Sequence, residues 1–195
     1  MQSKPFQPSV SAASPGENGG AGTAGLFLRE EQMRLAQDLF FLAWRDLAGA
    51  VDPVLAEAGL GRAHHRALHF VGRHPEIPVG VLLRMLGITK QSLARVLGEL
   101  TARGMVEQAA GRRDRRQRLL QLTERGAAFE RTLFEQQRER LLAAYREAGA
   151  GAVDGFRRVM RGIMAPDTRE LLGGPPEAGA PRRPAPGEFG AGSRA

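Results

Sequence analysis

Apolar residues recur at helical spacing along most of the chain, beginning in residues 26–51. The apolar positions of this first segment are Leu28, Leu35, Leu39, Phe40, Phe41, Leu42, Ala43, Trp44 and Leu47. They form a wide apolar side, so this helix is expected to be covered on more than one face. Pro53 is expected to bend or restart the helix, and Gly59 and Gly61 are expected to end it.

Three short helices are predicted next. The first spans about 62–74 and ends at Pro75, the second spans 79–86 and is closed by Gly87, and the third starts near Thr89, whose side chain can cap it. The apolar face of the third helix consists of Leu93, Val96, Leu97 and Leu100. Its opposite face carries Lys90, Gln91, Ala94, Arg95 and Gly98.

The hydrophobic period then changes from that of a helix to that of a strand. MVEQ at 105–108 and QRLLQL at 117–122 predict two short strands, joined by the charged tip AAGRRDRR at 109–116. Two helices with a glycine turn, followed by a hairpin with a basic tip, form a winged helix-turn-helix. The predicted fold is mostly α-helical with a small β-hairpin wing, and the winged unit is expected to span about 62–122.

Two further helices are predicted after the hairpin. One begins at Thr123, and a final helix spans about 153–172. The apolar residues of the final helix at i, i+3, i+4 and i+7 are Phe156, Val159, Met160 and Ile163. The long helices within 26–58 and 123–172 exceed what the winged unit needs for its own core. Their surplus apolar surface is expected to pack against a second copy of the chain, which gives a homodimer.

Composition limits the folded part to residues 26–172, one domain. The segments 1–25 and 173–195 are dominated by Gly, Pro, Ala and Ser, and they are expected to be disordered because they bury too little apolar surface. The sequence has no long apolar run and no secretion signal at its start, so a cytoplasmic protein without membrane contact is expected. The absence of cysteine excludes disulfides and thiolate metal sites.

The net charge of +7 is concentrated in one part of the chain. Residues 84–118 hold nine Lys or Arg against three Asp or Glu, a local excess of +6. Because neutralising phosphates releases condensed counterions, this cluster predicts double-stranded DNA as a partner. A bias toward Arg in the coding sequence would explain why Arg outnumbers Lys, but it would not explain the clustering.

The run LLRMLGITKQSLARVLGELTARGMVEQAAGRRDRRQRLLQLTERG at 82–126 resembles the MarR family of bacterial transcription regulators. The matching motifs are L-x-x-x-G-x-V at Leu100, Gly104 and Val106, D-x-R at Asp114 and Arg116, and LTERG at 122–126. TKQSL and HHRALHF are similar to the PetP-like branch of that family. The resemblance implies a homodimer with interlocking terminal helices, a recognition helix in each of two major grooves, wings in the flanking minor grooves and often a small-molecule effector.

The candidate DNA-binding residues lie at the start of the third short helix and in the wing. They are Thr89, Lys90, Gln91, Ser92, Arg95, Arg112, Arg113, Asp114, Arg115 and Arg116. Gln pairs with adenine and Arg with guanine, so Gln91 and Arg95 are predicted to read bases and Lys90 to contact phosphate. The alternative is that all three contact only phosphate or solvent. By the resemblance, Arg116 enters the minor groove and Asp114 orients an arginine. The alternative for the wing is an unordered basic loop that binds phosphates without fixed geometry.

All four histidines fall within residues 64–74. His65 and His69 are one helical turn apart, but apart from Glu76 no acid or cysteine lies near enough to complete a metal site, so none is expected. A further hypothesis is an effector pocket beside this helix. Its candidate residues are Trp44, His64, His65, His69 and Phe70. The alternative is that the aromatic residues simply belong to the core.

The sequence contains none of the common catalytic motifs: no G-x-S-x-G, P-loop, HExxH or dinucleotide fingerprint. The prediction is a DNA-binding transcription regulator that is not an enzyme and needs no cofactor. Two alternatives stay open. One is a winged-helix sensor or adaptor that contacts proteins, and the other is an architectural DNA-binding protein without sequence preference.

Overall fold

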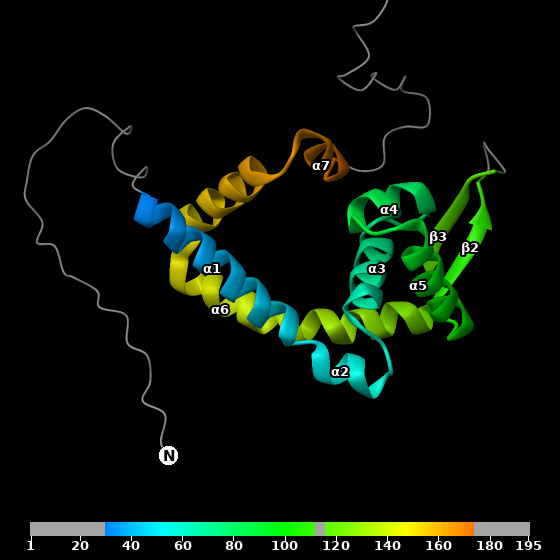
Figure 1. The fold of residues 1–195 in the computed structure, drawn as a ribbon. Coiled ribbons are helices and arrows are strands. Elements are labelled where there is room, and N and C mark those ends of the chain that lie inside the picture. The colour runs from blue at the N-terminus through cyan, green and yellow to red at the C-terminus, as the bar shows by residue number, and fades with distance from the viewer. Residues whose placement is uncertain (1–29, 112–115, 174–195) are drawn as a thin grey trace, which may run out of the picture. The chain divides into compact units, whose positions relative to one another are not determined.

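A computed structural model describes residues 30–111 and 116–173 of the 195-residue chain (Figure 1). The chain divides into two compact units, 1–42 and 43–195, and helix α1 (Glu30–Gly49) continues across their boundary. The tail predicted at 1–25 lies outside the described residues, as does the tail predicted at 173–195 apart from Gly173. Within the described ranges, no helix is long and apolar enough to cross a lipid bilayer.

In the first unit, the described part of α1 carries a row of large apolar side chains that are largely exposed. They are Met33, Leu35, Leu39, Phe40, Phe41 and Leu42. The rings of Phe40 and Phe41 meet edge to face, with their centroids 6.2 Å apart. The wide apolar side predicted for this helix is therefore present.

The second unit begins with the end of α1, then α2 (Asp52–Glu57) and α3 (Arg62–Arg73). The predicted restart at Pro53 is confirmed: the proline lies in the first turn of α2, where its missing N–H removes no helical hydrogen bond. Gly59 then adopts φ 61°, a left-handed conformation that glycine tolerates without strain.

Helices α4 (Val79–Leu86) and α5 (Lys90–Ala102) form the predicted helix-turn-helix. Gly87 ends α4 with φ 62°, and the Thr89 hydroxyl caps α5 by accepting a hydrogen bond from the Ser92 N–H at 3.1 Å. The buried side chains of α5 are Leu93, Val96, Leu97 and Leu100, as predicted. The exposed side of α5 carries Lys90, Gln91, Ser92 and Arg95 together with the small residues Ala94 and Gly98.

The sheet has three antiparallel strands in the order β1-β3-β2. Strands β2 (Val106–Ala110) and β3 (Arg118–Leu122) are the predicted hairpin. Strand β1 (Ile77–Pro78), just after the predicted end of the helix at Pro75, was not predicted from the sequence. Proline is tolerated there because β1 is an edge strand, where an N–H is not needed on the open side. Ile77 pairs with Leu120, and both are fully buried.

Helix α6 (Glu124–Ile163) starts directly after the hairpin, and Thr123 caps it as predicted. The Thr123 hydroxyl accepts a hydrogen bond from the Gly126 N–H at 3.0 Å and donates one to the Gly104 carbonyl at 2.6 Å. A Cβ on Gly126 would lie only 1.9 Å from the carbonyl oxygen of Met105. Glycine is therefore required for the close approach of α6 to the end of the helix-turn-helix.

The C-terminal part of α6 is kinked at Gly149, where the backbone has φ 77° and ψ 164°. Beyond the kink, the prediction of one final helix over 153–172 is wrong, because α6 ends at Ile163 and a separate helix, α7 (Pro166–Leu171), follows. The cause is Pro166. A proline drives the preceding residue into extended backbone, which interrupts a helix, and it is well suited to start the next one.

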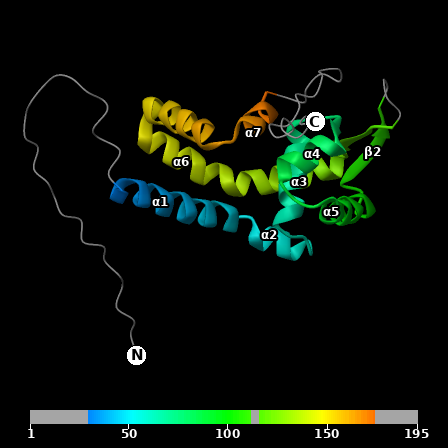
Figure 2. The same ribbon diagram turned by 45° about the horizontal axis from the view of Figure 1, so that its top comes forward.

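Helix α7 lies next to α4 in the views of Figures 1 and 2, and the two helices are in contact. Leu171 is buried and joins the hydrophobic core, whereas the adjacent Leu172 is 53% exposed. The core also receives Leu133 from α6 and Val71 from α3. Residues from α6 and α7, the helices that follow the winged unit in the chain, therefore pack into its core.

Candidate nucleic-acid interface

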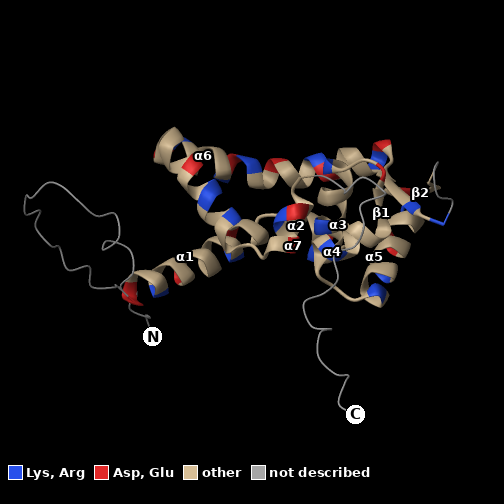
Figure 3. Ribbon diagram, turned by 90° about the horizontal axis from the view of Figure 1, so that it is seen from above, with Lys and Arg blue, Asp and Glu red and all other residues tan. Residues whose placement is uncertain are grey.

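The exposed side of α5 presents the residues predicted to meet DNA. Thr89, Lys90, Gln91, Ser92 and Arg95 are all exposed. The Thr89 hydroxyl, besides capping the helix, donates a hydrogen bond to the Ser92 hydroxyl at 2.9 Å, so these two side chains fix the first turn. Lys90, Gln91 and Arg95 project from that turn and the next. Figure 3 shows basic positions on α5 and beside β2.

Arg95 is joined to the interior of the protein through two further side chains. Its guanidinium Nη1 lies 3.4 Å from Oε1 of Glu99 on the next turn. The other carboxylate oxygen of Glu99, Oε2, lies 2.9 Å from Nε2 of His64, at an angle outside hydrogen-bond geometry. On the opposite side of the imidazole, His64 Nδ1 accepts a hydrogen bond from the Gly61 N–H at 3.0 Å. The chain of contacts leads from the start of α3 to the exposed face of α5.

Arg103 makes a second connection between α5 and the same loop. It follows the last residue of α5, and its guanidinium donates hydrogen bonds to the carbonyls of Ala58 at 2.6 Å and Gly59 at 3.3 Å. Neither Glu99 nor Arg103 could be assigned a role from the sequence. Their position in a basic, helical segment was visible, but the partners that give them a role lie more than 30 residues earlier in the chain.

The wing is the β2–β3 hairpin, in which Val106 pairs with Leu122 and Ala110 with Arg118. The Gly111 N–H donates to the Gln117 carbonyl at 2.9 Å, which brings the ends of the tip together. Arg116 and Arg118 are exposed. Together with Gln108, Ala109 and Ala110 they line a hollow of about 340 Å³. The predicted wing residues Arg112, Arg113, Asp114 and Arg115 lie outside the described residues.

The histidines on α3 face different surroundings. His64 is buried and turned toward Gly61 and Glu99, whereas His65 and His69 are partly buried. His69 Nδ1 lies 3.8 Å from Oε1 of Glu130 on α6, and its ring meets Phe70 edge to face at 5.3 Å between centroids. No group of three or more His, Asp or Glu side chains within the described ranges is arranged to hold a metal ion.

Burial shifts the pKa values of ionisable groups where α3 contacts α6. It lowers the pKa of His65 and, together with the positive charges of His65, Arg73 and His74, that of His69. Burial also raises the pKa of Glu130, against the lowering effect of Arg131 and Arg73. Each shift favours the neutral form of its group.

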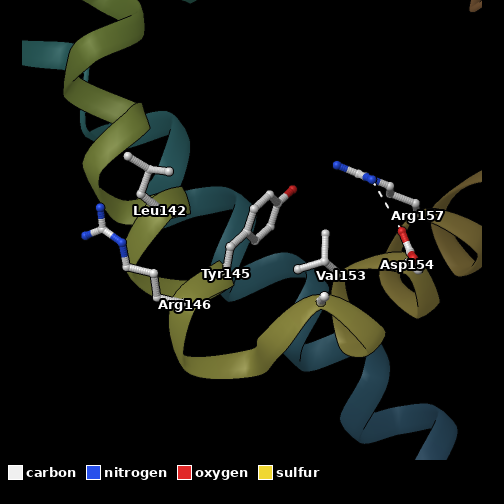
Figure 4. A pocket seen from close by; sticks show the side chains of 7 residues that line it. Leu142, Tyr145, Arg146, Val153, Asp154 and Arg157 are labelled. Atoms are coloured by element: carbon white, nitrogen blue, oxygen red, sulfur yellow. Dashed lines mark hydrogen bonds and ion pairs between the residues drawn. The ribbon is translucent and has the colours of Figure 1, made fainter.

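A separate hollow of about 390 Å³ lies at the kink in α6 (Figure 4). It is lined by Leu142, Tyr145, Arg146, Ala150, Val153, Asp154 and Arg157. Arg157 is paired there with Asp154 at 3.3 Å. None of the residues predicted to form an effector pocket lines this hollow. Among those, Trp44 is 55% exposed and Phe70 packs partly against the core.

The helix-turn-helix, the three-stranded sheet and the hairpin with its exposed arginines define a winged helix-turn-helix protein. The MarR family model matches residues 58–117 of the chain. Over 148 residues the chain is 49% identical to the HTH-type transcriptional regulator PetP of Rhodobacter capsulatus, with 76% of this chain and 89% of that protein covered. The chain belongs to the MarR family of DNA-binding transcription regulators.

Solved structures of similar fold include three regulators. NadR in complex with 4-hydroxyphenylacetate has a TM-score of 0.58 at 19% identity and covers 77% of this chain and 97% of its own. A crystal structure of MarR has a TM-score of 0.52 at 20% identity and covers 70% of this chain and 97% of its own. The S. aureus MepR–DNA complex has a TM-score of 0.51 at 13% identity and covers 65% of this chain and 94% of its own. At these identities the similarity establishes the mostly α-helical winged-helix fold.

Proposed function

We propose that the protein is a sequence-specific transcription regulator that binds an inverted-repeat operator as a homodimer. The observation that carries the proposal is the exposed polar face of α5, which is capped and fixed by Thr89 and stands beside a basic hairpin. A helix of this kind fits the major groove, where its first turns reach base edges. The hairpin then extends toward the flanking minor groove.

The residues of the interface have separate roles in this proposal. Gln91 and Arg95 read bases, because Gln offers a paired donor and acceptor to adenine and Arg a paired donor to guanine. Lys90 contacts phosphate, while Thr89 and Ser92 hold the first turn in place and face the backbone of the DNA. Arg116 enters the minor groove. Asp114 orients one of the neighbouring arginines Arg112, Arg113 and Arg115.

The dimer in this proposal uses the apolar residues that single chains leave exposed. In the last part of α6, the exposed apolar residues are Phe156, Val159 and Ile163. In α1 they include Leu39 and Phe41. Exposed apolar rows of this size on helices outside the winged unit are expected to be covered by a second copy, in line with the symmetric assemblies that most oligomers form. Two winged units then face successive major grooves.

An effector is the third part of the proposal. NadR, which shares the fold, was solved in complex with 4-hydroxyphenylacetate. For this chain we place the effector beside α3, near Trp44, His65, His69 and Phe70, with His64 behind them. To lower operator affinity, the effector must bind the conformation that does not bind DNA more tightly, because equal affinity for both states shifts nothing.

The test measures DNA binding by the purified full-length protein, using fluorescence anisotropy over a series of salt concentrations. The proposal expects binding that weakens steeply with salt and resists a large excess of unrelated DNA. If unrelated DNA competes for the protein as well as operator DNA does, the protein is an architectural DNA-binding protein. An absence of salt-dependent binding would indicate an adaptor that contacts proteins.

Three variants divide the interface further. Arg116→Ala is expected to weaken binding to all sequences and to reduce the salt dependence. Gln91→Ala and Arg95→Ala are each expected to cost about 1 to 3 kcal/mol of binding free energy on the operator and to relax the preference at particular base pairs. Equal losses on operator and random DNA for all three variants would contradict the assigned roles.

A further inference from the structure

His64 lies behind Glu99 of α5, with its Nε2 2.9 Å from the carboxylate oxygen Oε2. Its side chain is only 7% exposed, and its Nδ1 accepts the hydrogen bond from Gly61, so in the neutral ring the proton is on Nε2. That N–H is the group that faces the Glu99 carboxylate. Because the imidazole is held both by packing and by the backbone of the α2–α3 loop, Oε2 of Glu99 contacts a buried side chain whose place is set outside α5, at an angle outside hydrogen-bond geometry.

Glu99 in turn pairs with Arg95 on the exposed side of α5. An exposed ion pair between residues four apart on a helix contributes little by itself, because two long side chains must be ordered to form it. Here the Glu99 side chain is 38% exposed and in contact with the buried His64, whereas Arg95 is 72% exposed. The Arg95 guanidinium thus has a charged partner one turn along α5, and that partner is itself in contact with a buried side chain.

We propose that Glu99 is a positioning residue that sets the base preference of Arg95. The inference rests on the proposed function, in which Arg95 reads a base. An arginine that turns freely finds phosphate oxygens at many places along the groove, whereas one held along the helix reaches a base edge in one register. The carboxylate also repels phosphate, which disfavours contacts with the wrong sequence. Glu99 thereby lowers general DNA affinity and raises discrimination.

The experiment compares Glu99→Gln with the wild-type chain on two duplexes: the operator recovered from a random pool by the wild type, and a shuffled duplex of the same composition. Glutamine keeps the shape of the side chain but removes the charge that holds Arg95 and repels phosphate. We expect affinity for the shuffled duplex to rise several-fold, and the ratio of operator to shuffled affinity to fall about tenfold. Glu57→Gln is the matched control, since it removes the same charge from an exposed position on α2.

A repeat of the comparison in an Arg95→Ala background separates positioning from a general charge effect. If Glu99 acts through Arg95, Glu99→Gln no longer changes the preference at the base pair that Arg95 reads, and the two substitutions are strongly non-additive. Additive effects, or a Glu99→Gln variant that behaves like Glu57→Gln, would overturn the inference while the proposed function stands. A wild-type chain that enriches no sequence would overturn both.

His64→Gln tests the link to α3. The variant is expected to lower discrimination in the same direction as Glu99→Gln, with a smaller effect because Glu99 stays charged. Since His64 is buried, its thermal unfolding is measured beside the wild type. If the variant does not fold, Glu99→Gln, at a partly exposed position, still decides the inference. A folded His64→Gln variant with unchanged discrimination would remove His64 from the proposal.

Discussion

Glycines 104 and 126 occupy conformations that explain the motifs in which they occur. Gly104 has φ 63°, and its carbonyl accepts the Thr123 hydroxyl, so the end of α5 is connected directly to the start of α6. Gly126 allows α6 to pass against the backbone of Met105. The resemblance pointed to both glycines from the sequence. The close approach that requires Gly126 could not be seen there, because it depends on a tertiary contact.

Gly126→Ala is expected to destabilise the protein by about 1 to 3 kcal/mol or more, because the added methyl collides with a carbonyl that has no room to move. Gly98→Ala is the control: Gly98 lies inside α5 with open space around it, so alanine there should raise stability by about 0.5 to 1 kcal/mol. Both values are measured by chemical unfolding. A Gly126→Ala variant as stable as the wild type would show that α6 approaches the helix-turn-helix less closely than described.

For the candidate site, the sequence predicted which positions on α5 are exposed, but not how their side chains are held. The residues Lys90, Gln91 and Arg95 follow from the periodicity of α5, because an amphipathic helix fixes which side faces outward. The role of His64 could not be predicted in this way. From the sequence it was a candidate residue of an effector pocket, whereas its two nitrogens face Gly61 and Glu99. Whether an effector binds beside this helix stays a prediction.

At the scale of elements, the contact between α3 and α6 makes stability depend on pH. The pKa values of His65 and His69 are lowered by burial, so the unfolded chain, with values near 6.5, binds protons more readily than the folded one. Their contribution to stability is complete above about pH 6.5 and is lost as the pH falls toward the lowered values. Glu130 acts in the opposite sense, because its raised pKa favours the folded state as it takes up a proton near and above pH 4.5.

The expected result is a free energy of unfolding that decreases between pH 7.5 and about pH 5.5. The measurement is urea unfolding at a series of pH values, for the wild type and for the double variant His65→Gln/His69→Gln. The double variant should lose much of this slope, because glutamine does not titrate. The same slope in both proteins would assign the pH dependence to other groups.

Helix α7 gives a second test at this scale. Leu171→Ala is expected to destabilise the protein by about 2 to 3 kcal/mol, since Leu171 is 7% exposed and belongs to the core. Leu172→Ala, at the adjacent exposed position, should change stability by no more than about 0.5 kcal/mol. Thermal or chemical unfolding measures both. Equal effects of the two substitutions would show that α7 does not pack on the core in solution.

Most elements were predictable because their signals are local. Gly87 after α4, the caps at Thr89 and Thr123, and the change of period at the hairpin all act within a few residues. Strand β1 was missed because it has two residues and exists only through its pairing with β3. The end of α6 was missed for a different reason: the final helix was extended to Leu172 without taking Pro166 into account.

At the scale of the whole molecule, the exposed apolar side of the last part of α6 tests the proposed dimer. Phe156→Asp is expected to weaken dimerisation by about 100-fold or more, because it places a charge where an aromatic residue would be buried. Arg161→Asp, on the other side of the same helix, should leave the dimer intact. Sedimentation velocity at micromolar concentration measures both. A wild-type protein that is monomeric under these conditions would contradict the dimer itself.

The central claim is that the chain selects a DNA sequence through two copies of α5. The most direct test is selection from a random pool of double-stranded DNA with the purified full-length protein, followed by sequencing. The account predicts enrichment of an inverted repeat whose half-site centres lie about one helical turn, roughly 10 base pairs, apart. It also predicts that Gln91→Ala and Arg95→Ala change the enriched bases. A pool in which no sequence is enriched, although the protein retains DNA, would contradict the claim.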